Sequence, residues 1–206
     1  MKSTIIIATS NPGKLREFTA LLARHPFRLL TPKDIPHVPP IEETGTTYSQ
    51  NACLKAAAYA RAGRTFALAD DSGLEVDALE GAPGLHSARL AGPGRSDADR
   101  RAVLLEALLP FPQPWTAHFR CVAALASPSG ETWTAEGICA GLIIPVERGK
   151  HGFGYDPIFF LEQHGKTMAE LPEDAKNLIS HRSRATAAIL PTIYQALNIP
   201  WPGSPV

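Results

Sequence analysis

The chain has 206 residues, of which 44% are hydrophobic and 19% charged, a composition typical of a soluble globular protein with one sizeable core. Lysine plus arginine and aspartate plus glutamate number 20 each, so there is no net positive charge to attract a nucleic acid backbone. No apolar run approaches the length of a membrane span, and the first residues do not have the pattern of a signal peptide. The three cysteines are far apart and form no CxxC pair. We therefore expect a cytoplasmic protein that binds neither nucleic acid nor membrane.

The first segment of the chain predicts a strand, a tight turn and a helix. Residues 4–8 are apolar and rich in β-branched side chains, as in a buried strand. Residues 14–22 place leucine and phenylalanine on one helical face, and Pro12 with Gly13 forces a turn before them. The start of a helix presents unpaired N–H groups, and Lys14 adds a positive charge beside them. This pattern indicates an anion-binding loop at Ser10–Lys14; the alternative is an ordinary strand-to-helix connection.

The loop is not a phosphate-binding P-loop. That motif needs a glycine five positions before its Gly-Lys pair and a serine or threonine after it, where this chain has Ala8 and Leu15. The loop therefore lacks the hydroxyl with which P-loop enzymes hold a metal ion.

The rest of the chain alternates predicted strands with predicted helices, which indicates a mixed α/β sheet. We expect strands at 27–30, 66–69, 119–126, 132–144 and around 158–160, with a hairpin turn at 127–130. We expect helices at 51–61, opened by a Thr47–Gln50 capping box and stopped by Gly63, and from a Ser96–Asp99 cap to about 109. A last helix should cover 173–197, bent or interrupted by Pro191.

Two acidic pairs are candidates for metal binding. Glu42-Glu43 lies in the turn before the 51–61 helix, and Asp70-Asp71 follows an apolar strand, where α/β proteins place ligands. Carboxylates are the ligands that Mg²⁺ prefers, and a neighbouring carboxylate can take a proton from a bound water. The alternative for residues 70–73 is a simple turn, because Asp, Ser and Gly all favour turns.

Three further features could contact a ligand. Residues 149–157 combine glycines with Phe153 and Tyr155, which could stack on a base or simply plug the core. Lys176 and the 180–182 triplet fall on the predicted last helix, where they could donate to a purine 6-oxo group or form a solvated basic face. Lys55 shares a helical face with Asn51 and could make a second phosphate contact.

The order of these motifs along residues 4–197 resembles that of the inosine triphosphate pyrophosphatase family. The segments that carry the resemblance are SNPGK at 10–14, EETG at 42–45, NACLKA at 51–56, ADDSGLEVDAL at 69–79, GAPGLHSAR at 81–89, GFGYDPIFF at 152–160 and KNLISHR at 176–182. The resemblance implies Mg²⁺-dependent hydrolysis of noncanonical purine nucleoside triphosphates (ITP, dITP, XTP) to the monophosphate and pyrophosphate. It also implies an elongated, two-lobed α/β fold around a long mixed sheet with flanking helices, an active cleft between the lobes, and a homodimer.

The resemblance also implies roles for particular residues. Glu42 and Asp71 would hold Mg²⁺, with Asp71 also the catalytic proton acceptor and Asp70 and Glu43 in support. The triphosphate would be bound by Thr9, Ser10, Asn11, Lys14 and Lys55. The remaining substrate contacts would come from Ser72, Phe153, Gly154, Tyr155, Asp156, Lys176, His181 and Arg182. Ser183 stands where the family usually has glycine. We expect one catalytic domain at 1–198 and a Pro-rich tail at 199–206.

Two alternatives remain open from the sequence. One is a pyrophosphatase of the related Maf type, which would prefer dTTP or UTP. The other is a nucleotide sensor that uses the same pocket without catalysis.

Overall fold

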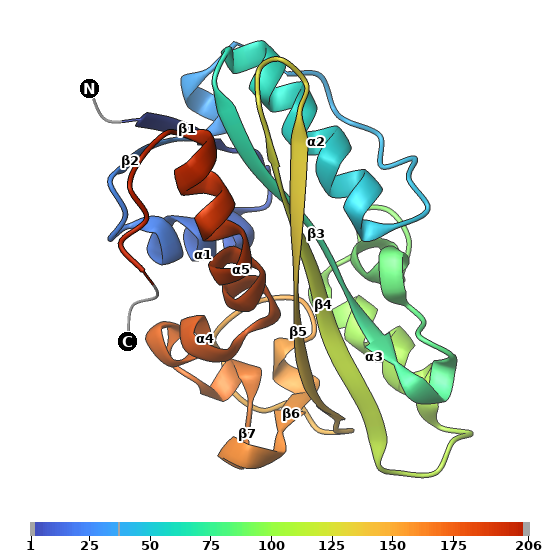
Figure 1. Ribbon diagram of the computed structural model, residues 1–206. Helices are drawn as coiled ribbons and strands as arrows, with labels where there is room; N and C mark the ends of the chain where they lie inside the picture. The colour runs from blue at the N-terminus through green and yellow to red at the C-terminus, as the bar shows by residue number, and fades with distance from the viewer. Residues whose placement is uncertain (1–2, 37, 204–206) are drawn as a thin grey trace. The chain divides into compact units, whose positions relative to one another are not determined.

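The computed structural model describes residues 3–36 and 38–203, and these form an α/β fold, as predicted. Within them one seven-stranded sheet has the order β2-β1-β3-β4-β5-β6-β7 (Figure 1). The strands are β1 (Ser3–Ile7), β2 (Phe27–Leu30), β3 (Phe66–Val76), β4 (Trp115–Ala126), β5 (Thr132–Ile143), β6 (Phe159–Leu161) and β7 (Lys166–Thr167). The α-helices are α1 (Pro12–Leu22), α2 (Tyr48–Gly63), α3 (Asp97–Leu108), α4 (Glu173–Ile179) and α5 (His181–Ala196). None of the helices in the described part of the chain is both long and apolar enough to cross a membrane.

The chain divides into two compact units. The first contains residues 1–71, 122–137 and 182–206, and the second contains residues 72–121 and 138–181. Strands β3, β4 and β5 therefore contribute residues to both units.

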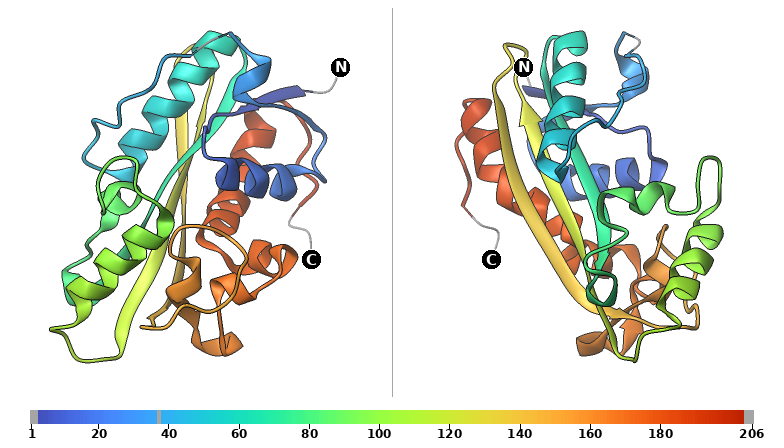
Figure 2. Two further views of the ribbon diagram at one scale, coloured as in Figure 1. Left: turned by 180° about the vertical axis from the view of Figure 1, so that it is seen from behind. Right: turned by 90° about the vertical axis from the view of Figure 1, so that its right-hand side faces the viewer.

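The first unit is built on parallel strand pairing. β1 pairs in parallel with β2 and with β3, with Ile5 opposite Leu29 on one side and Phe66 on the other. The apolar run of β1 is fully buried at Ile5, Ile6 and Ile7, as expected for a strand covered on both faces. In this unit α2 and α5 lie on opposite faces of the strands (Figure 2).

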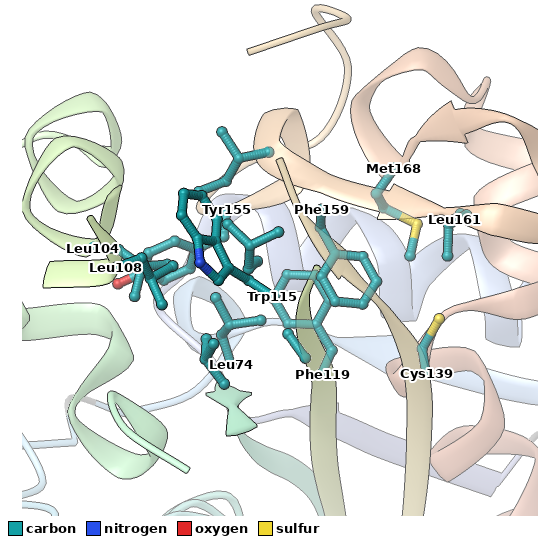
Figure 3. Close-up of a cluster of buried hydrophobic side chains, with 14 of the residues drawn as sticks. Leu74, Leu104, Leu108, Trp115, Phe119, Cys139, Tyr155, Phe159, Leu161 and Met168 are labelled. Carbon is teal, nitrogen blue, oxygen red and sulfur yellow. The ribbon is translucent and has the colours of Figure 1, made fainter. Parts of the chain in front are cut away.

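The second unit has its own hydrophobic core beneath α3 (Figure 3). Leu104 and Leu108 of α3 are buried there with Leu74 of β3 and Trp115 of β4. The Phe119 ring packs on that of another core residue, Phe159, at a centroid distance of 4.4 Å. β5 pairs antiparallel with β6, and β6 with β7, which completes this edge of the sheet.

Several predicted elements are confirmed. β2 has the predicted bounds, and the hairpin between β4 and β5 is closed by a 2.9 Å bond from the Ser127 N–H to the Glu131 carbonyl. Ser96 and Asp99 form the predicted capping box of α3. At α2 only half of the predicted box forms: the Thr47 hydroxyl caps the Gln50 N–H, but the Gln50 side chain accepts from Thr46 instead.

The prediction that the third strand breaks at residues 70–73 is wrong. β3 continues to Val76, and Asp70 and Asp71 are buried inside it. Local turn propensity is overridden here because ion pairs and hydrogen bonds from distant parts of the chain satisfy both carboxylates, which a local pattern cannot reveal.

The prediction of one helix over 173–197 is also wrong. The chain is extended at Ser180, with φ −66° and ψ 156°, and this residue separates α4 from α5. The Ser180 N–H still donates to the Lys176 carbonyl at 3.0 Å, so these two residues lie one turn apart at the end of α4, whereas Arg182 belongs to α5. Pro191 does not interrupt α5, which runs through it. Of the expected Pro-rich tail, residues 204–206 lie outside the described residues, and Trp201 packs edge-on against Tyr194.

Candidate active site

The loop after β1 is organised by its own side chains. Asn11 is the N-cap of α1, and its Oδ1 accepts from the N–H groups of Gly13 (2.8 Å) and Lys14 (3.1 Å). The Thr9 hydroxyl oxygen accepts from the Asn11 N–H at 3.2 Å, and Ser10 is exposed. The predicted strand and helix are confirmed, but the turn predicted at Pro12 and Gly13 is wrong: α1 begins at Pro12, two residues earlier than expected, and both residues are helical. The positive end of the helix and Lys14 thus lie at one loop.

Behind this loop lies a buried ion cluster in the first unit. Arg182 at the start of α5 is 1% exposed, and its guanidinium contacts Asp70 of β3 (Nη2–Oδ2 2.8 Å) and Glu17 of α1. Lys14 also reaches Asp70, at 3.0 Å. Burial alone would raise the pKa of Asp70, but Arg182, Lys14 and Lys55 outweigh it and hold that pKa well below its usual range. Asp70 is therefore ionised and ties together three elements of this unit.

The alternative that Arg182 belongs to a solvated basic face is wrong, because its side chain is fully buried. The second partner of Arg182, Glu17, was not predicted from the sequence. Glu17 lies 165 positions away in the chain, beside the apolar face of α1, and nothing local distinguishes it from a surface glutamate.

A second group in the same unit surrounds Asp71. Asn51 donates to Asp71 Oδ2 at 3.1 Å, and Lys55 Nζ lies 3.6 Å from Asp71 Oδ1 and 2.6 Å from Glu43. The predicted shared face of Asn51 and Lys55 on α2 is confirmed. Burial would lower the pKa of Lys55, but Asp70, Asp71 and Glu43 together raise it, so this lysine is charged.

Asp71 itself lacks enough compensating positive charge. Burial raises its pKa, Glu43 adds to the effect, and Lys55, Lys14 and Asn51 offset it only in part. A further cation beside this carboxylate would be stabilised electrostatically. The donor atoms here are carboxylate oxygens, which suit a hard divalent cation. The residues present therefore fit such an ion.

Glu42 stands apart from this group. It is exposed, and within residues 3–36 and 38–203 its side chain forms no ion pair or hydrogen bond, whereas Glu43 binds Lys55. The 42–45 segment reaches α2 because Gly45 donates its N–H to Asn51 Oδ1 at 2.8 Å. A Cβ at Gly45 would lie 2.7 Å from that oxygen, so only glycine allows this approach.

In the part of the chain described, no three metal-ligating side chains are gathered into one cluster.

The second unit holds the other predicted substrate residues. Asp156 Oδ2 accepts from Lys176 Nζ (2.6 Å) and from the Phe153 N–H (2.9 Å). The Lys176 ammonium lies 5.0 Å from the Phe153 ring centroid, within the range of a cation–π contact. Gly152 has φ +77°, and a Cβ there would meet Asp156, so the tight loop needs this glycine. Phe153, Asp156 and Lys176 are thus brought together.

The other residues of this unit differ in their surroundings. Tyr155 is buried in the hydrophobic core and donates its hydroxyl to the Ser87 carbonyl at 2.8 Å, and burial raises its pKa. For Tyr155 the core-packing alternative is therefore confirmed. The His181 ring stacks on the Phe119 ring at a centroid distance of 4.7 Å. This contact was not predicted, because nothing in the sequence around His181 indicates it. Ser72 is half-buried in β3, next in sequence to Asp71.

The chain matches known proteins over nearly its whole length. The model of the Ham1 family matches residues 5–192. A dITP/XTP pyrophosphatase from Geobacter sulfurreducens is 50% identical over 186 residues, covering 90% of this chain and 94% of the relative. One from Geobacillus kaustophilus is 49% identical over 182 residues, covering 88% and 89%.

Solved structures agree with these matches. A HAM1 protein from Coxiella burnetii has a TM-score of 0.83 at 40% identity, covering 95% of this chain and 98% of that one. A nucleoside-triphosphatase, also named dITP/XTP pyrophosphatase, from Mycobacterium abscessus has a TM-score of 0.72 at 38% identity, covering 92% and 99%. The resemblance drawn from the motifs is confirmed, and the chain belongs to the Ham1 family.

Proposed function

We propose that this protein hydrolyses noncanonical purine nucleoside triphosphates, namely dITP, XTP and ITP, to the monophosphate and pyrophosphate. The names of its relatives, about 50% identical over most of their length, support this activity. The observation that carries the proposal is the group of Asp71, Lys55 and Glu43, where two carboxylates and a charged lysine meet beside the first turns of α2. Such a group suits the binding and cleavage of a polyphosphate.

The triphosphate is bound by the loop after β1 together with α2. Lys14 and Lys55 attract phosphate oxygens and stabilise the charge that develops on the leaving pyrophosphate. The side chains of Thr9, Ser10 and Asn11 complete the phosphate contacts, whereas the N–H groups of Gly13 and Lys14 are already bound by Asn11 Oδ1. The cap that Asn11 forms over Gly13 and Lys14 supports this role, because it fixes the loop before substrate arrives.

We propose that Mg²⁺ is held by Asp71 and Glu42, with Glu43 beside them. When bound, the ion offsets the repulsion between carboxylates and triphosphate and lowers the pKa of a coordinated water. Asp71 then accepts the proton of the attacking water.

The base is bound by residues of the second unit, whereas Arg182 lies buried in the ion cluster of Asp70 and Glu17. The ammonium of Lys176 and the ring N–H of His181 are donors that suit the 6-oxo group of hypoxanthine or xanthine, where adenine presents a donor of its own. Phe153 offers a half-buried ring for stacking, and Ser72, Gly154, Tyr155 and Asp156 line or support the site. A site built on hydrogen bonds discriminates strongly, because a wrong base leaves buried groups unpaired.

A substrate panel tests this function. With Mg²⁺ present, initial rates of pyrophosphate release should be highest for dITP, XTP and ITP, and far lower for dATP, dGTP and dTTP. Faster turnover of dTTP or UTP would favour a Maf-type enzyme. Binding of these nucleotides without any hydrolysis would favour a sensor.

The two candidate carboxylates of the 42–45 segment can be separated by matched substitutions. We expect Glu42→Gln to raise the Mg²⁺ concentration for half-maximal rate by about tenfold or more. Its Tm should be unchanged, because the Glu42 side chain makes no ion pair or hydrogen bond among the described residues. A normal Mg²⁺ requirement in Glu42→Gln, combined with a raised one in Glu43→Gln, would assign the ligand to Glu43 instead.

We also propose that residues 1–198 act as one catalytic domain, that two copies form a homodimer, and that the protein is cytoplasmic. The proposed activity supports the location, since it would keep noncanonical nucleoside triphosphates out of nucleic acids. No disulfide joins the three cysteines, which all lie in the described residues, as suits a reducing compartment. A mass equal to one chain in light scattering would contradict the dimer.

A further inference from the structure

The backbone of Gly154, in the middle of the predicted base-binding segment, is bound on both sides of its Cα by side chains of α3. Its N–H donates to Asp97 Oδ2 at 2.7 Å, and its carbonyl accepts from Arg101 Nη1 at 2.8 Å. Asp97 and Arg101 lie one helical turn apart, so both side chains project from the same face of α3. Gly154 has φ +62°, and because glycine adopts positive and negative φ about equally readily, the two contacts with α3 select one of several accessible backbone conformations.

Arg101 also holds the other end of this loop. Its Nε and Nη2 form a fork on the Glu147 carboxylate, at 2.8 and 2.9 Å. Glu147 and Gly154 are therefore tied to one guanidinium, which closes the glycine-rich stretch between them. The planar guanidinium suits this double task, because a lysine ammonium cannot form the fork and reach the carbonyl at the same time.

The residues on either side of Gly154 carry the proposed base contacts. Phe153 precedes it, and its N–H is bound by Asp156, which also holds Lys176. Tyr155 follows it, and its hydroxyl is anchored on the Ser87 carbonyl. A shift of the Gly154 peptide would therefore move Phe153 relative to Lys176, the pair on which the base is proposed to lie.

The surroundings favour a positioning role over a purely stabilising one. The Glu147 side chain is 47% exposed and that of Asp97 39%, so neither completes the hydrophobic core. An ion pair with one exposed partner adds little to folding stability, although the Arg101 side chain itself is only 11% exposed. By contrast, small displacements of groups that contact a substrate cost up to about a hundredfold in rate.

We propose that Asp97 and Arg101 are positioning residues that set base selectivity by fixing the Gly154 peptide. This inference rests on the proposed function, because it takes Phe153 and Lys176 as base contacts. Neither Asp97 nor Arg101 touches the substrate. Both act through the backbone of the loop that runs from residue 147 to residue 154.

The test is the ratio of kcat/KM for dITP to that for dGTP. In Arg101→Met this ratio should fall by about tenfold or more, mainly through a higher KM for dITP. Arg101→Lys should restore it in part. Asp97→Ala should lower the ratio, whereas Asp97→Asn should keep it, since the amide oxygen can still accept from the Gly154 N–H. Arg24→Met, which removes an exposed arginine of the first unit, is the charge-matched control and should match the wild type.

The outcomes separate this inference from the proposed function. If the wild type prefers dITP but Arg101→Met and Asp97→Ala keep that preference, the positioning role is wrong while the function stands. Equal losses on dITP and dGTP with a lowered Tm would show a structural role only and overturn the inference. If the wild type itself shows no preference for dITP over dGTP, the proposed function fails, and this inference fails with it.

Discussion

Asp71→Asn is expected to lower kcat for dITP hydrolysis by about 10²–10⁴-fold, the range that a general base contributes. The asparagine keeps the shape of the side chain and an oxygen that can accept from Asn51, but it cannot take a proton from water. Lys55 keeps its 2.6 Å contact with Glu43, so the surroundings should hold their arrangement. Pyrophosphate release under saturating dITP and Mg²⁺ measures the effect.

A matched control shows whether the loss of a carboxylate outside the proposed site also lowers the rate. Asp77 follows the end of β3, its side chain is 60% exposed, and Asp77→Asn should leave kcat within about twofold of the wild type. A Tm for Asp71→Asn close to that of the wild type would exclude unfolding as the cause. Near-normal turnover by Asp71→Asn would contradict the role of Asp71 as proton acceptor.

Asp70→Asn is expected to cost about 3–5 kcal/mol in the free energy of unfolding, because it removes one partner from a fully buried ion cluster. Arg182 would lose its contact with Asp70 while keeping the one with Glu17, and Lys14 would lose its 3.0 Å contact. The Tm should fall by roughly 10 °C for a chain of this size. Urea unfolding at pH 7 measures the difference, and a cost below about 1 kcal/mol would contradict the account of the cluster.

The difference in the free energy of unfolding between the wild type and Asp70→Asn should depend on pH. The pKa of Asp70 is lowered in the folded state, so its contribution to stability is fully present above the ordinary aspartate pKa of 3.8. That contribution is lost as the pH falls below 3.8 towards the folded-state pKa. The gap between wild type and Asp70→Asn should therefore shrink in acid. Asp99→Asn is the control: Asp99 also has a lowered pKa, through its hydrogen bonds with Ser96, but it is only half-buried, and its loss should cost far less.

Local patterns predicted much of the fold. The β-branched run of β1, the Ser96–Asp99 cap and the hairpin before β5 each depend on neighbours within a few residues, and all three form. The shared face of Asn51 and Lys55 also follows from helical spacing alone. These features were accessible because their physical causes lie inside the segment itself.

The errors have a different cause. β3 runs through Asp70 and Asp71 because Arg182, 112 positions away from Asp70, compensates the first carboxylate, and α2 compensates the second. The break between α4 and α5 at Ser180 was likewise not predictable, because no glycine or proline lies beside it. Such pairings appear only when the chain is folded, so the sequence of either partner alone looks like a turn or a surface charge.

The candidate site was predictable chiefly through its motifs. Residue types and spacing suggested an anion loop and two acidic pairs, and the structure brings Asp71, Asn51, Lys55 and Glu43 together. It does not bring Glu42 into contact with them. The buried position of Tyr155 separates it from Phe153, although the two aromatic rings look equivalent in the sequence.

The most direct test of the central claim is the identity of the phosphorus products. Incubation of the protein with dITP and Mg²⁺, followed by ³¹P NMR, should give dIMP and pyrophosphate in equal amounts. Formation of dIDP with inorganic phosphate would place the cleavage at the wrong anhydride. That result, or unchanged dITP, would contradict the chemistry assigned to the carboxylates and lysines around β3.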